Sequence, residues 1–470
     1  MPHWLPVLAM NHISLSRRCF PLLVVLLLAA HASAGRKEQL LHVFEGGSDG
    51  QNPAGGVVFD KQGNLYGATT YGGLSACAIG GQCGIVFELS PPVRKGDPWT
   101  ETVIYEFQGQ GDNDGGVPAG GLIIDGLGNL YGTTAYGGSG GCVVLGLRTG
   151  CGTVYELSPP DRTDALWAET ILYSFQGGDD GDFPSGDLTF DSRGTLYGAT
   201  EFGGGKGNAC DVFYGGNCGT AFKLSPPKQK GGAWSEQVLH SFAGIVNGNQ
   251  TGDGANPNGG LVLNGKGTIY GTTYIGGYNC AHHSNQGCGT VFELKPPIGK
   301  NGVWIEKQIH VFRNGADGGT PNGGLVLDTK GALYGGADGG SKGGGVIFRL
   351  AVTGCGAWKE TSIYKFYSNT YGFSPGVSHF DSHHNLYGTT QYFPDAYSGS
   401  VFRLRPPTQT VEHWTLTFLH KFNFLFGDGI APYPQLTTDD AGNLYGATES
   451  GGDAQACYPG GCGVVFEVSP

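Results

Sequence analysis

Several features that would place this chain in a common class of protein are scarce or missing. Only 14% of its 470 residues are charged, and no block of Lys and Arg is present. The formal net charge is −12, so neither nucleic acid nor an anionic membrane surface is an expected partner. Helical periodicity over several turns is absent beyond residue 34, and no Gly-X-Y repeat occurs. These absences exclude a helix bundle and collagen.

Common catalytic signatures are missing as well. The sequence contains no H-E-x-x-H, no G-x-S-x-G, no P-loop and no dinucleotide-binding fingerprint in a βαβ context. We therefore expect no cofactor and, by default, no enzyme activity. A glycosidase or lyase with paired carboxylates stays open, because its two acids need not be neighbours in the sequence.

Glycine is abundant, with 88 residues, and 39% of the chain is hydrophobic. Glycine costs about 1 kcal/mol at each interior position of a helix, whereas turns accommodate it. The apolar content is too high for a disordered chain. The composition therefore predicts a turn-rich β protein, and its length favours a modular one.

Residues 1–34 have the pattern of an export signal. Arg17 and Arg18 precede an apolar run from Phe20 to Ala30, which is followed by Ala32-Ser33-Ala34. This order is typical of a signal peptide, of either the general secretory or the twin-arginine type. We expect a secreted, periplasmic or cell-surface bacterial protein with no membrane span in the mature chain.

Residues 35–470 consist of seven similar units. Each contains Leu-Tyr-Gly or Ile-Tyr-Gly, with the tyrosine at Tyr66, Tyr131, Tyr197, Tyr270, Tyr334, Tyr387 and Tyr445. Each unit also carries four apolar runs of strand length, here called strands a to d, separated by turn residues. In the second unit these are residues 121–124, 129–134, 152–157 and 167–175. A turn of the type Asp60 to Asn64 joins strands a and b.

Seven four-stranded units predict an all-β, seven-bladed β-propeller, with an open solenoid or separate sandwiches as the alternatives. A Trp opens strand d in the first six units, at Trp99, Trp167, Trp234, Trp304, Trp358 and Trp414. The seventh unit has no strand d, but Glu38 to Phe44 has the pattern of one. We expect this N-terminal strand to complete the last blade of a single propeller domain over residues 35–470.

The unit P-x-G-G-L, D-x-x-G-N-L-Y-G-T-T, G-G, G-T-V-F-x-L-x-P-P, W-x-E resembles the Gloeo_Verruco (GloVer) repeat of bacterial exported proteins, over roughly residues 38–470. The fifth and sixth units depart most from it. Gly335-Gly336-Ala337-Asp338 replaces the usual Gly-Thr-Thr stretch, and His383-His384 replaces the glycine of the turn. The resemblance implies export and implies no particular activity.

Most of the 12 cysteines occur in pairs between strands b and c, at Cys77/Cys83, Cys142/Cys151, Cys210/Cys218, Cys280/Cys288 and Cys457/Cys462. Their repetition at one structural position predicts local disulfides and an oxidising compartment. A structural zinc needs about four ligands, which two Cys per loop do not supply. Cys355 is left over, as an inert thiol or as a reactive, intermolecular one.

The b–c and d–a loops lie at the same end of the blades, which is the candidate binding face. Carboxylates recur in the d–a loops at Asp49, Asp114, Asp180, Asp253, Asp317 and Asp428. Aromatic residues follow strand b at Tyr71, Tyr136, Phe202 and Tyr392. Rings and carboxylates around a concave face suit a sugar or a peptide. Turn formation and packing between blades are the structural alternatives.

Two of the d–a loops are richer in carboxylates than the others. Asp112 and Asp114 lie in one of them, and Asp180 and Asp182 lie in the next. Calcium is the cation that such oxygens would suit, and no other metal site is predicted. A histidine recurs on strand d, at His42, His240, His310 and His420, but on separate blades, so we expect it to be structural.

The sequence thus favours an exported, monomeric binding or scaffold propeller that recognises a glycan, a peptide or a surface partner through its b–c and d–a loops. Two alternatives are a carbohydrate-active hydrolase or lyase and a purely structural envelope protein. The enzyme hypothesis requires an asymmetric cluster of acids with shifted pKa values at the channel mouth. The irregular fifth and sixth units are the first place to look for it.

Overall fold

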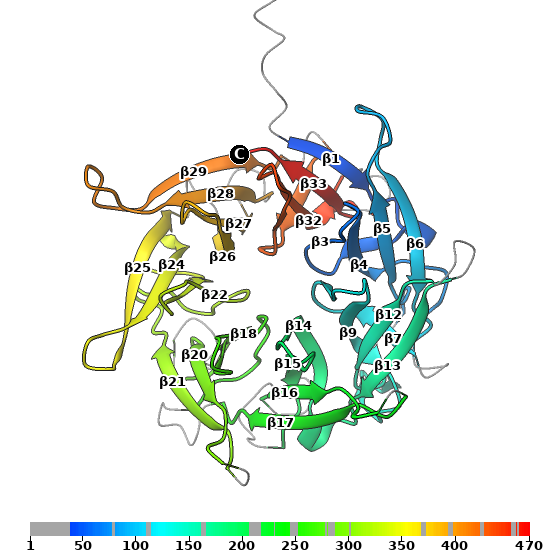
Figure 1. Cartoon of the computed structure of the whole chain (residues 1–470), viewed down its shortest axis with the longest axis horizontal. Helices are drawn as coiled ribbons and strands as arrows, with labels where there is room; N and C mark the ends of the chain where they lie inside the picture. The colour runs from blue at the N-terminus through cyan, green and yellow to red at the C-terminus, as the bar shows by residue number, and fades with distance from the viewer. Residues whose placement is uncertain are drawn as a thin grey trace, which may run out of the picture. The chain divides into compact units, whose positions relative to one another are not determined.

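The computed structural model is a seven-bladed β-propeller, in which small antiparallel sheets form a ring (Figure 1). The fold predicted from the seven repeats is therefore confirmed. The described residues are 38–77, 80–109, 114–160, 166–205, 218–229, 231–244, 252–277, 280, 287–299, 302–367, 373–392, 398–423, 427–452, 457 and 460–470. The expected export signal lies outside them and stays a prediction.

Each blade is an antiparallel meander in which strand a is innermost and strand d outermost. The inner strands a are β2 (Gln51–Pro53) with β3 (Val58–Phe59), β7 (Gly115–Pro118) with β8 (Ile123–Ile124), β14 (Asp182–Phe190), β18 (Val262–Leu263), β22 (Val326–Leu327), β26 (Phe373–Phe380), and β30 (Gly429–Pro432) with β31 (Thr437–Thr438). Strands b are β4 (Leu65–Tyr71), β9 (Leu130–Gly137), β15 (Leu196–Phe202), β19 (Ile269–Thr273), β23 (Leu333–Ala337), β27 (Leu386–Tyr392) and β32 (Leu444–Gly451).

Strands c are β5 (Ile85–Ser90), β12 (Thr153–Ser158), β16 (Thr220–Ser225), β20 (Thr290–Lys295), β24 (Gly343–Val352), β28 (Ser400–Arg405) and β33 (Val464–Val468). Strands d are β6 (Thr100–Glu106), β13 (Ala168–Ser174), β17 (Ser235–Ser241), β21 (Ile305–Val311), β25 (Trp358–Tyr367), β29 (Thr415–Lys421) and β1 (Glu38–Val43). The loops also contain a short hairpin, β10 (Val143–Val144) with β11 (Leu147–Arg148), and the 3-10 turns η1 (Gly47–Asp49) and η3 (Gly178–Asp180). Within the described ranges, no helix has the length and apolar character needed to cross a membrane.

The N-terminal strand closes the ring, as its pattern predicts. β1 pairs antiparallel with β33, with Glu38 opposite Val468 and Val43 opposite Val464. Figure 1 shows β1 in blue lying along β33 in red. The seventh blade therefore has its strands from both ends of the chain, and β1 covers the edge of β33.

Neighbouring blades pack through a repeated pair of aromatic rings. The Phe that follows strand d contacts the Phe or Tyr of strand c in the next blade, with ring centroids 5.0 to 5.5 Å apart. Phe44, which follows β1, contacts Phe87 in this way and joins the last blade to the first. The glycine of Leu-Tyr-Gly is required here, because a Cβ on Gly67 would collide with the Phe87 ring.

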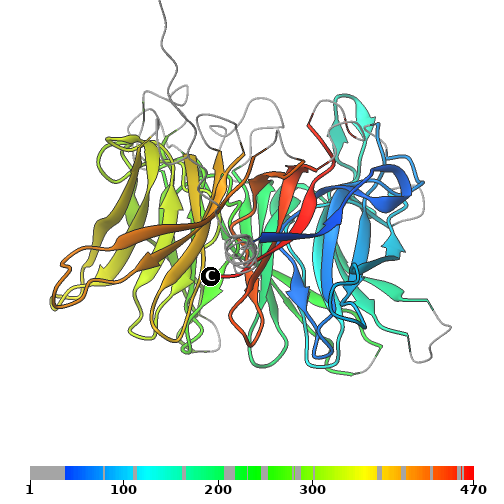
Figure 2. The ribbon, with the colours of Figure 1, turned by 90° about the horizontal axis from the view of Figure 1, so that it is seen from above.

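A second contact joins the blades at the upper end, defined as the end that carries the b–c and d–a loops (Figure 2). The proline that enters each inner strand sits on the glycine that opens strand c of the preceding blade. A Cβ on Gly84 would lie 2.5 Å from Pro118 Cδ, and φ of Gly84 is +89°. The residue before each proline has a positive φ, as Val117 does, and the Val117 N–H donates to the Cys83 carbonyl. The paired Gly and Pro of the repeat are thus the two halves of one contact.

At the lower end, the first residue of each a–b turn, an Asp in six blades and Asn264 in the fourth, organises the turn and bonds the repeat tyrosine. Asp60 Oδ1 accepts the backbone N–H groups of Gln62 and Asn64, each at 2.8 Å. Asp60 Oδ2 accepts the hydroxyl of Tyr66 at 3.2 Å. The predicted turn chemistry is confirmed, and it explains why Asp and Tyr recur together.

Candidate functional site

Disulfides line the upper face, as the paired cysteines predict. Four of the predicted pairs are bonded: Cys77–Cys83, Cys142–Cys151, Cys280–Cys288 and Cys457–Cys462. Cys218 is also disulfide-bonded, and its predicted partner Cys210 lies outside the described residues. Cys355 is free and exposed. The disulfides fit an extracellular protein.

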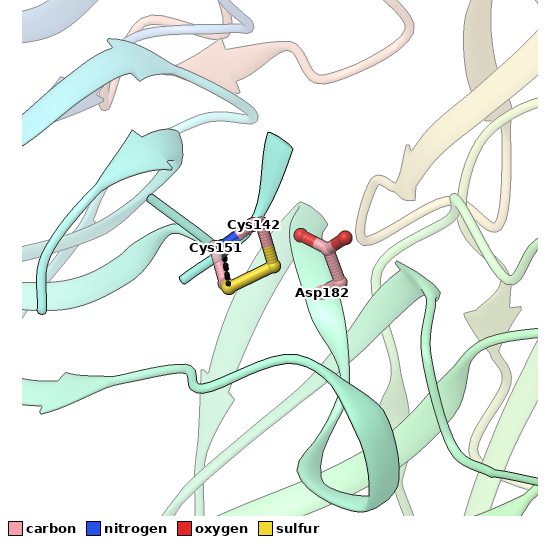
Figure 3. A group of neighbouring side chains, drawn as sticks. All are labelled: Cys142, Cys151 and Asp182. Carbon is pink, nitrogen blue, oxygen red and sulfur yellow. Dashed lines mark hydrogen bonds between the residues drawn. A yellow bond between two sulfur atoms is a disulfide. The ribbon is translucent and has the colours of Figure 1, made fainter. Parts of the chain in front are cut away.

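Figure 3 shows the Cys142–Cys151 disulfide beside Asp182, which opens the inner strand of the next blade. The three side chains are close enough to share a metal ion, but both sulfur atoms are already used in the S–S bond. Burial, followed by the charge of Asp180, raises the pKa of Asp182 to about 6, although the Phe183 N–H opposes the shift. Asp182 is therefore a partly buried acid at a contact between blades.

The carboxylates of the d–a loops lie beside side chains of the strand d that precedes each loop. Four of them hydrogen-bond the His or Tyr of the preceding strand d: Tyr105–Asp114 at 3.1 Å, Tyr173–Asp180 at 3.0 Å, His240–Asp253 at 2.8 Å and His420–Asp428 at 3.0 Å. In the other two, a histidine Nε2 lies close to the carboxylate: His42–Asp49 at 3.1 Å and His310–Asp317 at 3.3 Å. Each also accepts a backbone N–H, such as that of Gln108 for Asp114 at 2.7 Å. The structure thus spreads these carboxylates around the ring as loop anchors, and their part in ligand binding stays a prediction.

A glutamate from the next blade approaches several of these anchors. Glu169 hydrogen-bonds Asp114, and burial, followed by the Asp114 charge, raises the pKa of Glu169 to about 8. Burial likewise raises the pKa of Glu101, Glu236 and Glu306 to about 7.

The set His240, Asp253 and Glu306 could hold a metal ion, and so could Glu38, His420 and Asp428. The same acid pair recurs with Tyr105 in place of histidine, which favours a network of hydrogen bonds. The calcium predicted near Asp114, Asp180 and Asp182 stays a prediction, and Asp112 lies outside the described residues.

The aromatic residues that follow strand b do not form one surface. Tyr136 and Phe202 both pack on Phe183, with centroids 5.3 and 5.8 Å apart. Tyr71 is half-buried. Tyr392 is 38% exposed, and burial followed by the charges of Glu449 and Asp338 raises its pKa. Only Tyr392 belongs to the cluster described next.

The position just before these aromatic residues is where the blades differ most. From the first blade to the seventh it is Thr70, Ala135, Glu201, Tyr274, Asp338, Gln391 and Glu449. These residues belong to, or directly follow, the upper ends of the strands b, beside the entry of the inner strands. Gln391 Oε1, for example, accepts from Asn322 Nδ2 of the preceding blade at 3.2 Å. The side chain at this position is small in the first two blades, and it is polar, acidic or aromatic in the other five.

Side chains at the upper ends of five blades are linked electrostatically. Burial, followed by the charges of Asp338, Glu201 and Tyr392, raises the pKa of Tyr274, so side chains of four blades lie within electrostatic range. Burial, followed by the charges of Glu449 and Tyr392, raises the pKa of Tyr433 on the seventh inner strand. We call this set the mouth cluster: Glu201, Tyr274, Asp338, Tyr392, Tyr433 and Glu449.

Asp338 is the most distinctive member of the mouth cluster. Burial raises its pKa to about 6, against a hydrogen bond from Ser374. Its Oδ1 is buried and has no hydrogen-bond partner among the described residues. Asp338 also lines a pocket of about 410 Å³ between Cys288 of the fourth blade and Gly343 of the fifth. The fifth blade has no cysteine pair, and its b–c connection is short.

These features define a disulfide-bearing β-propeller whose similar blades carry an asymmetric, acidic channel mouth. The chain belongs to the Gloeobacter/Verrucomicrobia repeat family, whose model matches residues 31–282 and 279–470. The family resemblance seen in the repeat unit is thereby confirmed. No functionally curated protein matches the sequence.

Solved structures that resemble this chain include several enzymes. A fungal alcohol oxidase of the AA5 family, in complex with copper, has 12% identity and a TM-score of 0.49, covering 91% of this chain and 75% of that one. A gluconolactonase from Xanthomonas campestris has 14% identity and a TM-score of 0.35, covering 68% and 79%. The intramolecular trans-sialidase from Ruminococcus gnavus has 11% identity and a TM-score of 0.38, covering 89% and 94%.

Proposed function

We propose that the protein is an exported binding propeller that recognises a neutral glycan at the mouth cluster. The observation that carries this proposal is the change of one strand-b position from Thr70 and Ala135 to Glu201, Tyr274, Asp338 and Glu449 on an otherwise repeated scaffold. Carboxylates accept hydrogen bonds from sugar hydroxyls, and tyrosine rings offer an apolar face with a polar tip. The defined cluster contains no Lys, Arg or His, so an anionic ligand would be repelled.

The test is binding of the exported protein to a glycan array containing neutral, amino and uronic-acid oligosaccharides, followed by calorimetry on any neutral hit. Asp338→Asn and Glu449→Gln each remove an acceptor and should weaken binding by about tenfold or more. Glu412→Gln, at an exposed site in a c–d loop, is the matched control and should bind normally. Binding of uronic-acid oligomers alone, or of nothing on the array, would contradict the proposal and favour a structural envelope role.

A hydrolase or lyase of carbohydrates is the second candidate, and Asp338 favours it. A buried carboxyl whose pKa is raised to about 6 has the character of a general acid, and Glu449, whose pKa burial also raises, lies in the same cluster. Release of reducing ends from a neutral glycan by the parent protein, lost in Asp338→Asn while binding persists, would replace the binding function with this one. Binding without turnover would exclude it for that glycan.

A further inference from the structure

The lower half of the channel contains a cavity that the mouth cluster does not use. Its volume is about 350 Å³, and the inner strands of all seven blades line it. Its wall is about equally polar and apolar, with the aliphatic side chains of Val58, Ile123 and Val262 near the a–b turns. Glycines line its upper part, at Gly56, Gly121, Gly260 and Gly324.

Two polar side chains stand where other blades have these glycines. In the unit P-x-G-G-L the second glycine is replaced by Asp187 in the third blade and by Gln435 in the seventh. The Asp187 carboxylate accepts the Gly121 N–H at 2.7 Å and a hydrogen bond from the Gln435 side chain. Asp187 therefore faces the inner strands of the second and seventh blades from the third.

The hydrogen bonding at this pair is incomplete. Burial raises the pKa of Asp187, although its two hydrogen bonds favour the charged form. The described residues that line the cavity include no Lys, Arg or His to neutralise this carboxylate. Gln435 Oε1 is buried and has no hydrogen-bond partner among the described residues. The cavity thus presents two acceptor groups, one of them a carboxyl group, above a wall that includes aliphatic side chains.

We propose that this cavity binds a primary alkylammonium group, such as a lysine side chain of a peptide, between Asp187 and Gln435 Oε1. An ammonium group donates three hydrogen bonds and supplies the positive charge that is missing from the surroundings of Asp187. Its methylene stem matches the aliphatic wall formed by residues such as Val58 and Ile123. A calcium ion requires six to eight oxygens, more than these two side chains supply.

The probes are butylammonium, butanol and tetramethylammonium, titrated into the exported protein and followed by calorimetry and by NMR. Butylammonium supplies stem, charge and donors together. Butanol lacks the charge, and tetramethylammonium lacks the N–H donors. Butylammonium should bind at least about tenfold more tightly than either of the others, because a hydrogen bond to a charged group contributes more than a neutral contact.

Variants locate the site. Asp187→Asn keeps the shape and removes the charge, and Asp187→Gly restores the residue of most other blades, so at least one of them should fold. Both should reduce butylammonium affinity by about tenfold or more, and Gln435→Leu should reduce it less. The exposed Glu412→Gln is the matched control and should bind as the parent does. Equal affinity for butanol, or unchanged butylammonium binding in folded Asp187 variants, would overturn the proposal.

Discussion

Replacing Glu169 by Gln tests the acid pair that joins the first two blades. In the folded protein Glu169 hydrogen-bonds Asp114, and its pKa rises from the ordinary 4.5 to about 8, first through burial and then through the Asp114 charge. The folded state therefore holds this proton more tightly than the unfolded chain. By linkage, Glu169 carries no penalty below pH 4.5 and lowers the free energy of unfolding progressively as pH rises toward about 8.

The size of the effect follows from the shift. At 1.36 kcal/mol per unit, the full shift corresponds to about 4–5 kcal/mol. Glu169 is only half-buried, so solvent screening reduces the expected effect to about 1–2 kcal/mol. Gln keeps a donor toward Asp114 and has no charge to acquire, so Glu169→Gln should unfold like the parent at pH 5 and be about 1–2 kcal/mol more stable at pH 8.

Denaturant unfolding at both pH values, followed by tryptophan fluorescence, measures this difference. The exposed Glu412→Gln serves as the control and should leave the pH dependence unchanged. A Glu169→Gln variant that is destabilised equally at pH 5 and pH 8 would refute the reasoning, because it would mean that the ionised carboxylate is the form the fold requires.

Three further changes test the contacts that hold the ring together. Gly84→Ala should cost about 2–4 kcal/mol of unfolding free energy, because a Cβ there would meet both the Thr69 carbonyl and Pro118 at a positive φ. Gly63→Ala, with the same φ of +89° and open space, should cost only about 1–2 kcal/mol, and equal losses in denaturant titrations would contradict the close packing around Gly84. The double variant Cys142→Ser/Cys151→Ser removes a disulfide of sequence separation 9 and should lower the free energy of unfolding by about 2–3 kcal/mol. If a reductant does not change the unfolding of the parent protein, the bond does not stabilise the fold. Deleting residues 38–44 exposes the edge of β33 and should lower Tm and produce oligomers in light scattering, whereas a stable monomer would show that closure is dispensable.

The architecture could be predicted because the same sequence pattern occurs in each of the seven units. Seven recurrences of Leu-Tyr-Gly count the blades, and the phase of the repeat places Glu38 to Phe44 beside the last strand c. The disulfides followed from cysteines at one fixed position before strand c. These features depend on local patterns that occur separately in each unit, so one sequence was sufficient to predict them.

The site was harder to predict because it lies where the repeats disagree. Alignment by shared residues highlights Tyr71 and its equivalents, whereas Glu201, Tyr274 and Glu449 occupy the variable position one residue earlier. Asp338 was noticed as a departure from the repeat, but its place in the channel depends on contacts between blades. Reading the repeats for their differences would have identified this position.

The pairing of the d–a loop carboxylates with the glutamate on strand d of the next blade was also missed, although the sequence contains a sign of it. In the sixth d–a loop Tyr371 takes the place of the aspartate, and in the sixth strand d Leu416 takes the place of Glu169 and its equivalents. The two acids therefore disappear together, as expected for partners across one contact between blades.

The pairing of β1 with β33 also fixes the order in which the protein can be completed. β1 is the first of the described strands and its partner β33 is the last, so the seventh blade cannot be completed until the chain has been made through Val468. Glu449 belongs to β32 of the same blade, so the mouth cluster also cannot be complete before the seventh blade has been made.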